Sequence, residues 1–463
     1  MSAPVVVILA AGQGTRMRSA TPKLLHPLCG RTLIGWVVEA ARGAGVSRIV
    51  VVDGPGEQLR RELAEDVVTV VQQRALGTAD ALRAAGEVLP PDTTVVVING
   101  DVPLIRPETI RALAAERAAT GAAATILTAV LENPTGYGRV LRARDGTVQR
   151  VVETKRLQDA TAEQLRVQEI NAGVYAFDSN ALRSALAEVR NNNAQGEYYL
   201  PDVLSILSAE GKKVTAMRLD DVAETLGVND RVQLAQVRAI AQRLIADRLM
   251  RSGATIVDPA NTVIDFDVSL APDTRIEPGS ALHGATAVGE GSVIGPHSTL
   301  IDTVVGSGCQ VVHSYLSGAR LDDGVSVGPF AYLRPGAVLR DGAKAGTFVE
   351  IKNSEVGARS KVPHLSYVGD ATIGQDTNLG ASTITANYDG VRKHRTVIGN
   401  HVHISVDTTL VAPVTVGDDS YTGAGSVITK EVPEGALGIA RARQTNIGGY
   451  AERVAERLRG KRT

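Results

Sequence analysis

Hydrophobic positions follow two alternating patterns over the first half of the chain. Short runs rich in Val and Ile are separated by stretches in which apolar residues recur at helical spacing. This alternation predicts an α/β domain with a Rossmann-like, mostly parallel sheet and helices on both faces. The expected strands are Val5–Leu9, Ile49–Val52, Val67–Val71 and Val95–Ile98, and the expected helices are Leu33–Ala44, Thr78–Val88 and Glu108–Thr120.

Two further features of residues 1–230 predict a hairpin and the edge of the sheet that binds ligands. Asp145-Gly146, between Arg139–Arg144 and Val148–Val152, is typical of a hairpin turn. Ligands of open α/β sheets bind beyond the carboxyl ends of the strands. We therefore expect the ligand site of this domain at that edge.

Residues 231–251 have the spacing of one amphipathic helix. Its apolar positions fall three to five residues apart, with Arg and Gln between them. The segment separates two regions of different composition, so we interpret it as a helical arm that links two domains. The alternative is a last helix packed on the first domain. The apolar positions are Val232, Val237, Ile240, Leu244 and Leu249.

From residue 252 to residue 463 the helical pattern gives way to a six-residue repeat. An aliphatic residue, mostly followed by a small one, recurs at every sixth position. This period predicts a parallel β-helix whose stacked coils bury the aliphatic positions. Two sets carry the repeat: Val356, Val362 and Val368, and the longer series Ile398, Ile404, Leu410, Val416, Thr422 and Ile428.

The repeat is interrupted once, between Thr385 and Ile398. The inserted residues 387–395 include Lys, Arg and His. Repeat proteins place insertions as loops on one face, often the binding face. We therefore expect this loop to contact phosphate groups, in preference to a purely solvated turn.

Composition excludes several classes of protein. A chain of 463 residues is too long to fold around a single hydrophobic core, so two or three domains are expected. A formal charge of −1 disfavours a nucleic-acid partner. The two cysteines, Cys29 and Cys309, have no metal-like spacing, which fits a reducing compartment. No apolar run approaches the ~20 residues of a membrane span, and Val5–Ala11 lacks the basic flank of a signal peptide. A cytoplasmic protein without a membrane partner is expected.

A glycine loop follows the first expected strand. In Leu9–Met17, glycines at a strand-to-helix junction let backbone N–H groups approach a phosphate. The loop lacks the Gly-Lys-Ser/Thr of a P-loop, and Met17 stands where a dinucleotide-binding fold has its third glycine. Arg16 and Lys23 supply two cations for a triphosphate.

The full Leu9–Met17 string resembles the signature of sugar-nucleotide pyrophosphorylases. Together with the hexapeptide half, the chain resembles bacterial bifunctional N-acetylglucosamine-1-phosphate uridyltransferase/glucosamine-1-phosphate acetyltransferases over nearly its whole length. The resemblance implies a left-handed β-helix, a homotrimer with acetyltransferase sites between subunits, and synthesis of UDP-N-acetylglucosamine. It further implies Mg²⁺ as cofactor, with UTP, acetyl-CoA and sugar 1-phosphates as small-molecule substrates.

The same resemblance assigns roles in residues 1–230. It implies Mg²⁺ ligands at Asp101 and Asn229, uracil contacts at Gln72, Gly77 and Thr78, and a sugar pocket that includes Glu197 and Tyr199. Family members usually carry Tyr where this chain has Asn99, and we expect a small effect. The UTP and UDP-N-acetylglucosamine contacts are Leu9, Ala10, Ala11, Gly12, Lys23, Gln72, Gly77, Thr78, Asn99, Asp101, Gly138, Glu153, Asn171 and Asn229.

The expected uridylyl chemistry needs no general base. A sugar 1-phosphate is already mostly dianionic at pH 7, because its second pKa is about 6. The site has to align two anions and neutralise the departing pyrophosphate. Arg16 and Lys23 are the predicted catalytic cations.

The resemblance assigns acetyl transfer to the repeat domain. Acylation of an amine requires removal of a proton, which suits a histidine near neutral pH, and His364 matches the family's base. The glucosamine 1-phosphate contacts are Arg334, Lys352, Tyr367, Asn378 and Lys393, and the acetyl-CoA contacts are Ala381, Asn387, Tyr388, Ala424 and Arg441.

One departure from the family falls in this second site. The family carries Gly-Ser before Asp407, with the serine near the thioester, whereas this chain has Ser405-Val406. Loss of one oxyanion donor can cost ~10²–10³ in rate. Ser405, Thr408 or a backbone N–H are the candidates to replace it. Milder changes nearby are Ser382 for a glycine and Ala386 for a cysteine.

Other hypotheses remain open from the sequence. The chain could be a single-activity pyrophosphorylase whose β-helix only oligomerises, or a non-catalytic regulatory or scaffold homologue. The non-catalytic hypothesis is disfavoured, because the chain retains the expected phosphate and metal ligands Arg16, Lys23, Asp101 and Asn229. His401 and His403 are interpreted as a surface pair, because the sequence shows no acidic or cysteine partner beside them.

Overall fold

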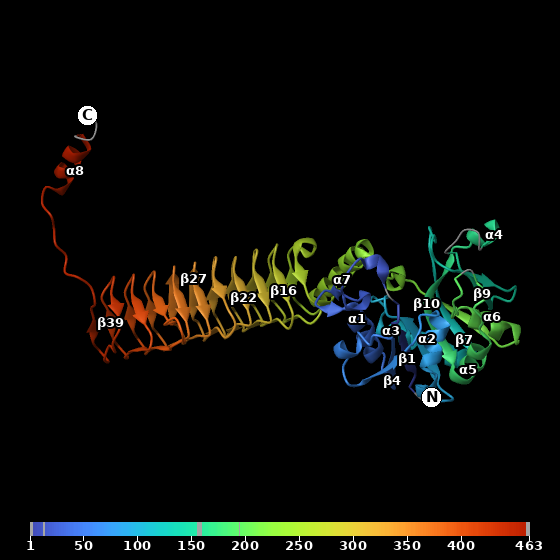
Figure 1. The fold of residues 1–463 in the computed structure, drawn as a ribbon. Coiled ribbons are helices and arrows are strands. Elements are labelled where there is room, and N and C mark those ends of the chain that lie inside the picture. The colour runs from blue at the N-terminus through green and yellow to red at the C-terminus, as the bar shows by residue number, and fades with distance from the viewer. Residues whose placement is uncertain (1–2, 13, 155–159, 194, 460–463) are drawn as a thin grey trace. The chain divides into compact units, whose positions relative to one another are not determined.

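The chain forms two compact units. The computed structural model describes residues 3–12, 14–154, 160–193 and 195–459 (Figure 1). One unit comprises Met1–Leu244 and the other Ile245–Thr463. Gln13, in the glycine loop, lies outside the described residues, as do residues 460–463 at the end of the sequence.

The first unit is built on a mixed sheet with the order β11-β7-β10-β6-β1-β4-β5. Strand β10 runs antiparallel to both its neighbours, and the other pairs on this path are parallel. The prediction of a mostly parallel sheet is therefore confirmed. The strands are β1 (Val5–Leu9), β4 (Arg48–Asp53), β5 (Val67–Val71), β6 (Thr94–Asn99), β7 (Ala124–Val130), β10 (Glu169–Asp178) and β11 (Val214–Arg218).

Hydrophobic side chains cover both faces of this sheet. One core joins it to α1 (Leu33–Gly43) and α3 (Pro107–Thr120). The other joins it to α2 (Thr78–Ala84), α5 (Ser179–Glu188) and α6 (Asp202–Ala209). A sheet buried on both faces needs continuous apolar strands, which explains the Val and Ile runs.

Two local expectations in this unit can be checked directly. The expected hairpin is present, since β8 (Arg139–Arg142) pairs antiparallel with β9 (Val148–Val152). The single helix expected over residues 78–88 is wrong. Helix α2 ends at Ala84, and Gly86–Val88 forms a separate 3₁₀ turn. Glycine is the poorest helix former after proline, so an interruption there is physically reasonable.

The helix expected over residues 231–251 forms as α7 (Arg231–Arg251), and the two compact units divide within it, after Leu244. The expected buried stripe is partly wrong, because Val232 is exposed at the first turn. Ile240 and Leu244 are only partly buried. The observed stripe has regular three- to four-residue spacing and consists of Leu234, Val237, Ala241, Ile245 and Leu249.

The second unit is a left-handed parallel β-helix. Short strands from β12 (Thr255–Ile256) to β41 (Leu437–Gly438) stack into three parallel sheets. The aliphatic positions of the six-residue repeat point inward, from Val356 at 0% exposure to Ile428 at 4%. The repeat prediction is confirmed, because each sixth position reaches the next face of the prism and points into its interior.

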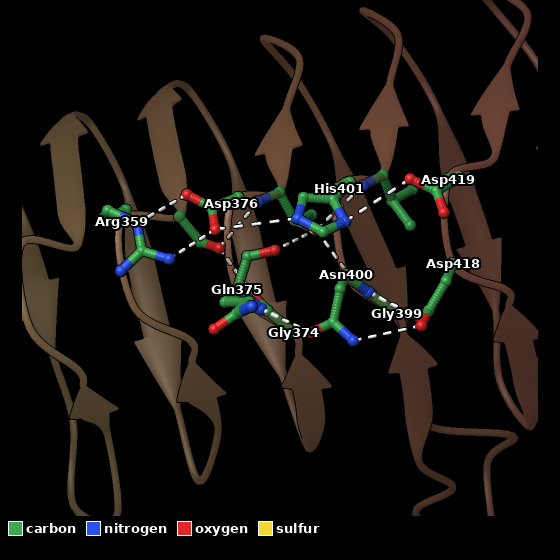
Figure 2. Close-up of polar contacts among 12 residues, drawn as sticks. Arg359, Gly374, Gln375, Asp376, Gly399, Asn400, His401, Asp418 and Asp419 are labelled. Carbon is green, nitrogen blue, oxygen red and sulfur yellow. Dashed lines mark hydrogen bonds and ion pairs between the residues drawn. The ribbon is translucent and has the colours of Figure 1, made fainter.

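One corner of the prism shows how adjacent coils are joined (Figure 2). Asn400 Oδ1 accepts a hydrogen bond from the backbone N of Gln375, and Asp418 Oδ1 accepts one from the N of Asn400. Arg359 forms two hydrogen bonds with Asp376 in the next coil. Side-chain oxygens thus satisfy turn N–H groups of the preceding coil, which apolar turn residues could not do.

His401 lies at this corner between two acidic side chains (Figure 2). Its ring nitrogens are 3.8 Å from Asp376 Oδ2 and 3.5 Å from Asp419 Oδ1. The expectation that it has no acidic neighbour is therefore wrong, because stacking brings together residues distant in sequence. It remains a surface residue, and the described residues contain no cluster of three or more His, Cys, Asp or Glu suited to a metal.

The last described element is α8 (Tyr450–Arg459), whose side chains are exposed or partly exposed. Among the described helices, none combines the length and apolar character needed to cross a bilayer.

Candidate active sites

A pocket of about 910 Å³ opens at the carboxyl ends of β1 and β6 in the first unit. Every residue that the sequence assigned to uridylyl transfer lines it, although these residues extend along the chain from Leu9 to Asn229. They are Leu9, Ala10, Ala11, Gly12, Arg16, Lys23, Gln72, Gly77, Thr78, Asn99, Asp101, Gly138, Glu153, Asn171, Glu197, Tyr199 and Asn229. Their individual roles remain predictions.

The glycine loop holds Lys23 against the floor of this pocket. Gly14 has a φ of +60°, and a Cβ there would lie 2.4 Å from Lys23 Cβ. Glycine therefore satisfies two constraints at once, a left-handed backbone and a close approach. The 3₁₀ turn Lys23–Leu25 fixes the lysine backbone, with His26 N donating to Lys23 O at 3.2 Å.

The two predicted metal ligands converge on the Lys23 ammonium group. Lys23 Nζ lies 2.6 Å from Asp101 Oδ2 and 3.4 Å from Asn229 Oδ1. A backbone hydrogen bond of 2.9 Å from Val228 N to Asp101 O holds their segments together. A carboxylate and an amide oxygen therefore face one point at the end of β6.

The predicted uracil contacts form one preorganised wall. Gln72 Nε2 donates to Asp80 Oδ2 at 2.8 Å and to Gly77 O at 3.1 Å, which leaves its Oε1 to accept from a ligand. Gly77 has a φ of +109°, and a Cβ there would lie 2.5 Å from Tyr198 O. Sequence reasoning missed Asp80, which orients Gln72 and follows Gly77-Thr78 on α2.

Several of the predicted sugar contacts line another part of the same pocket. Asn171 N donates to Gly138 O at 2.9 Å, and Asn171 Nδ2 donates to the Tyr175 hydroxyl at 2.7 Å. Burial raises the pKa of Tyr175, so this hydroxyl stays protonated. Arg139, which the sequence did not single out, is buried and donates to Pro134 O at 2.6 Å and to Tyr137 O. It holds the segment that carries Gly138.

Three predicted phosphate-binding cations gather in the second unit around β28 (Glu350–Lys352). Arg334 pairs with Glu350 at 2.8 Å, and this bond raises the pKa of Arg334. Lys352 and Lys393 interact directly. Lys352 lowers the pKa of Lys393, because two positive charges close together disfavour the protonated form, and a nearby carboxylate lies beside Lys352. Two ammonium groups this close favour a shared anion.

That nearby carboxylate is Asp370, which sequence reasoning missed. It is 7% exposed and accepts from Asn353 Nδ2 at 2.6 Å and from Asn387, with Lys352 Nζ at 3.5 Å. Burial raises the pKa of a carboxyl group, but these donors outweigh it, and the pKa of Asp370 lies below its ordinary value. Asn387, a predicted acetyl-CoA contact, is thereby buried and fixed by Asp370.

A column of equivalent turn positions carries the predicted base and the acetyl-CoA contacts. His364, Ala381, Val406 and Ala424 each precede a residue with positive φ, in successive coils. Backbone hydrogen bonds join the column: Ser382 N to His364 O at 3.3 Å, Asp407 N to Ala381 O at 2.8 Å, and Gly425 N to Val406 O at 2.9 Å. Arg441 lies beside Gly425.

The serine that the family carries before Asp407 would therefore stand in the middle of this column, where this chain has Val406. Val406 is 48% exposed there. Thr408 is wrong as a substitute, because its buried hydroxyl donates to Ser405 O at 2.7 Å and contacts Thr422 Oγ1. Ser405 is partly exposed, and its backbone N–H is already bound to Thr422 Oγ1 at 2.9 Å. Of the two side-chain candidates, the Ser405 hydroxyl remains the accessible one.

The remaining predicted contacts lie near the same coils. Tyr367 begins β31 (Tyr367–Gly369), Asn378 begins β33 (Asn378–Leu379), and both are partly exposed. The inserted loop is organised by Asp389, which accepts from Val391 N at 2.8 Å and from His394 Nε2 at 2.7 Å. Backbone donors first, then His394, hold the pKa of Asp389 far below its ordinary value. Tyr388 and Lys393 are exposed on this loop.

These features define a class of protein: a nucleotidyltransferase domain joined to a hexapeptide-repeat acyltransferase domain. Two family models match accordingly. The MobA-like NTP transferase domain covers residues 6–192, and the bacterial transferase hexapeptide (six repeats) covers residues 395–430.

Curated relatives extend this similarity to the full length. The chain is 54% identical to the bifunctional protein GlmU of Kineococcus radiotolerans, over 96% of this chain and 91% of that protein. It is 50% identical to GlmU of Streptomyces avermitilis, over 97% and 94%, and 47% identical to GlmU of Brevibacillus brevis, over 98% and 98%. The chain belongs to the GlmU family of bifunctional uridyltransferases and acetyltransferases.

Proposed function

We propose that this chain makes UDP-N-acetylglucosamine in two steps, each at its own site. The second unit acetylates glucosamine 1-phosphate from acetyl-CoA, and the first transfers uridylyl from UTP to N-acetylglucosamine 1-phosphate, releasing pyrophosphate. The convergence of Lys23, Asp101 and Asn229 in the pocket supports the second step most directly. The cluster of Arg334, Lys352 and Lys393, together with the exposed column that carries His364, supports the first.

Mg²⁺ fits the pocket by the chemistry of its donors. Asp101 and Asn229 present two hard oxygen ligands to one point. Mg²⁺ is commonly held by one or two carboxylates together with substrate phosphates, rather than by a cage of protein ligands. When bound, it supplies charge neutralisation on the triphosphate.

The chain's own residues align the uridylyl reaction. Gln72 Oε1 is free to accept the uracil N–H, and the backbone at Gly12 faces open space where phosphates can approach. Asn171, fixed by Tyr175, orients the sugar. The sugar phosphate oxygen then attacks the α-phosphorus while Arg16 and Lys23 neutralise the departing pyrophosphate.

His364 removes the proton in the acetyl reaction. The 2-amine of glucosamine 1-phosphate attacks the thioester carbon, His364 accepts the amine proton, and CoA leaves as the C–S bond breaks. Arg334, Lys352 and Lys393 hold the phosphate, whose charge relieves the repulsion between the two lysines. Asp370 fixes Lys352 and Asn387 for this task.

The acetyl site calls for a second copy of the chain. Its residues lie on the outer surface of the prism, with His364, Tyr388, Ala424 and Arg441 all exposed. Acyl transfer in open water would leave the thioester unprotected, so we propose a homotrimer in which a neighbouring subunit closes the site. On dilution below the trimer dissociation constant, acetyl transfer should fall while uridylyl transfer persists. Sedimentation at the same concentrations gives the assembly state.

One pair of variants tests the assignment of acetyl transfer to the second unit and of uridylyl transfer to the first. Purified wild type, His364→Ala and Asp101→Asn are each given acetyl-CoA with glucosamine 1-phosphate, or UTP with N-acetylglucosamine 1-phosphate and Mg²⁺. His364→Ala should release CoA about 10³-fold more slowly than wild type yet still yield pyrophosphate, and Asp101→Asn should do the reverse. CoA release at the wild-type rate in His364→Ala would remove this residue as the base.

A second candidate function has one specific observation in its favour. Val406 places an apolar side chain in the column that should face the thioester. A single-activity uridylyltransferase on an oligomerising prism would show no CoA release from the wild-type protein. Pyrophosphate production would be normal in that case.

A further inference from the structure

The Lys23 ammonium group lies between the two side chains proposed as metal ligands. It is 2.6 Å from Asp101 Oδ2 and 3.4 Å from Asn229 Oδ1. The side chains of Lys23 and Asp101 are only 11% and 22% exposed. Water therefore screens this pair less than it screens a surface ion pair, and the carboxylate is well neutralised without any metal.

A divalent cation between the same two oxygens would need the space that the ammonium group fills. Mg²⁺ binds oxygen at about 2.0–2.1 Å. A cation that close to both oxygens would compete with Lys23 Nζ for the same two partners, and like charges held on one carboxylate oxygen repel strongly.

We propose that Lys23 is the resident counter-ion of the metal site and that nucleotide has to draw it away before metal binds Asp101 and Asn229. This ordering rests on the proposed metal site. Lys23 lines the same pocket as the glycine loop, so triphosphate oxygens offer its ammonium group a new partner. The metal therefore enters with the nucleotide and not before it, and Lys23 passes from the metal ligands to the phosphates.

Only the side chain of Lys23 has to move. Its backbone is fixed by the 3₁₀ turn and by the close approach of Gly14, so the displacement is confined to a flexible four-carbon stem. Metal binding to the nucleotide-free protein is weakened by the fraction of molecules in which Lys23 occupies the site.

The test measures Mn²⁺ binding to the full-length protein without nucleotide, from the electron paramagnetic resonance signal of free Mn²⁺. Lys23→Met should tighten binding by about tenfold over wild type. Arg16→Met is the matched control, since it removes one positive charge from the same pocket and, among the described residues, Arg16 has no ion pair. The control should change the affinity by less than about twofold.

Two outcomes overturn the proposal: equal tightening in both variants, which is a general field effect, or no tightening in Lys23→Met. Thermal unfolding checks that each variant is folded, and Lys23→Gln should give the same tenfold gain if Lys23→Met does not fold. In Lys23→Met/Asp101→Asn the gain should disappear. If it persists, the metal does not bind at Asp101, and the proposed metal site fails instead of the ordering.

Discussion

The uridylyl site and the acetyl site differ in how much of each one chain supplies. In the first unit, loops at the strand ends surround a pocket of about 910 Å³, and all the assigned residues line it. In the second, the assigned residues lie along the outer faces and one turn column of a prism whose interior is filled by aliphatic side chains.

The difference follows from the two architectures. Parallel strands with helices on both faces leave a crevice where the connecting loops diverge. A solenoid of identical coils has flat faces and repeated corners, and it forms extended surfaces instead of deep pockets. We therefore propose that one copy of the first unit encloses its own reaction, whereas the acetyl site of the second unit is completed by a neighbouring copy.

Metal removal should separate the two sites most completely. Excess EDTA should abolish uridylyl transfer, because the departing pyrophosphate loses its main counter-charge, and should leave acetyl transfer unchanged. Coupled assays of pyrophosphate and CoA on one sample measure both. Added Mg²⁺ should restore the first activity, and a parallel loss of both activities would contradict two independent sites.

Loss of the proposed base should have the next largest effect, on the second site alone. His364→Ala should lower kcat for acetyl transfer by about 10³-fold, within the usual range for general base catalysis. His403→Ala is the control, an exposed histidine that stacks on Tyr421 in a nearby coil. If both variants lose activity equally, the effect reflects the coil and not the base.

Asp370→Asn should destabilise the second unit by about 2 kcal/mol at pH 7, because charge-assisted hydrogen bonds to a buried carboxylate are lost. The folded pKa of Asp370 is lowered, so its contribution is complete above the unfolded value of 3.8 and is lost as pH falls through the folded value. The variant and wild type should therefore converge in acid.

Urea unfolding followed across pH 3 to 7 measures this difference. Asp376→Asn removes a partly exposed partner of Arg359, and water screens this pair, so the cost should be clearly smaller than that of Asp370→Asn. If the two variants cost the same at pH 7, Asp370 behaves as a surface carboxylate.

The smallest expected effect is an increase in the rate of acetyl transfer. Val406→Ser places a hydroxyl in the middle of the turn column. It should raise the rate of acetyl transfer about two- to tenfold, which corresponds to the net free energy of one hydrogen bond. Val397→Ser, at a similarly exposed valine on another face, should have no effect. If Ser405→Ala alone lowers the rate of the wild type, the Ser405 hydroxyl already performs this role.

Short-range patterns determined most of the fold and the composition of both sites. The period of six predicts the prism because it is the period of the structure itself, and the Val and Ile runs predict strands buried on both faces. The family's motifs predicted which residues line the pocket, since each motif is a contiguous string. The interruption of the helix at Ala85 and the exposure of Val232 were not predicted, because local propensity is a weak guide at helix ends.

Contacts between residues of different motifs were decided only by the tertiary structure. Asp80 orients Gln72, Asp370 fixes Lys352 and Asn387, and His401 meets aspartates of two neighbouring coils. No single motif contains these pairs. The Lys23–Asp101 ion pair joins residues 78 positions apart, and its proximity comes from β1 and β6 lying side by side. Sequence determined which groups are present, while folding determined their partners, because charge and hydrogen-bond energies depend on distance and burial.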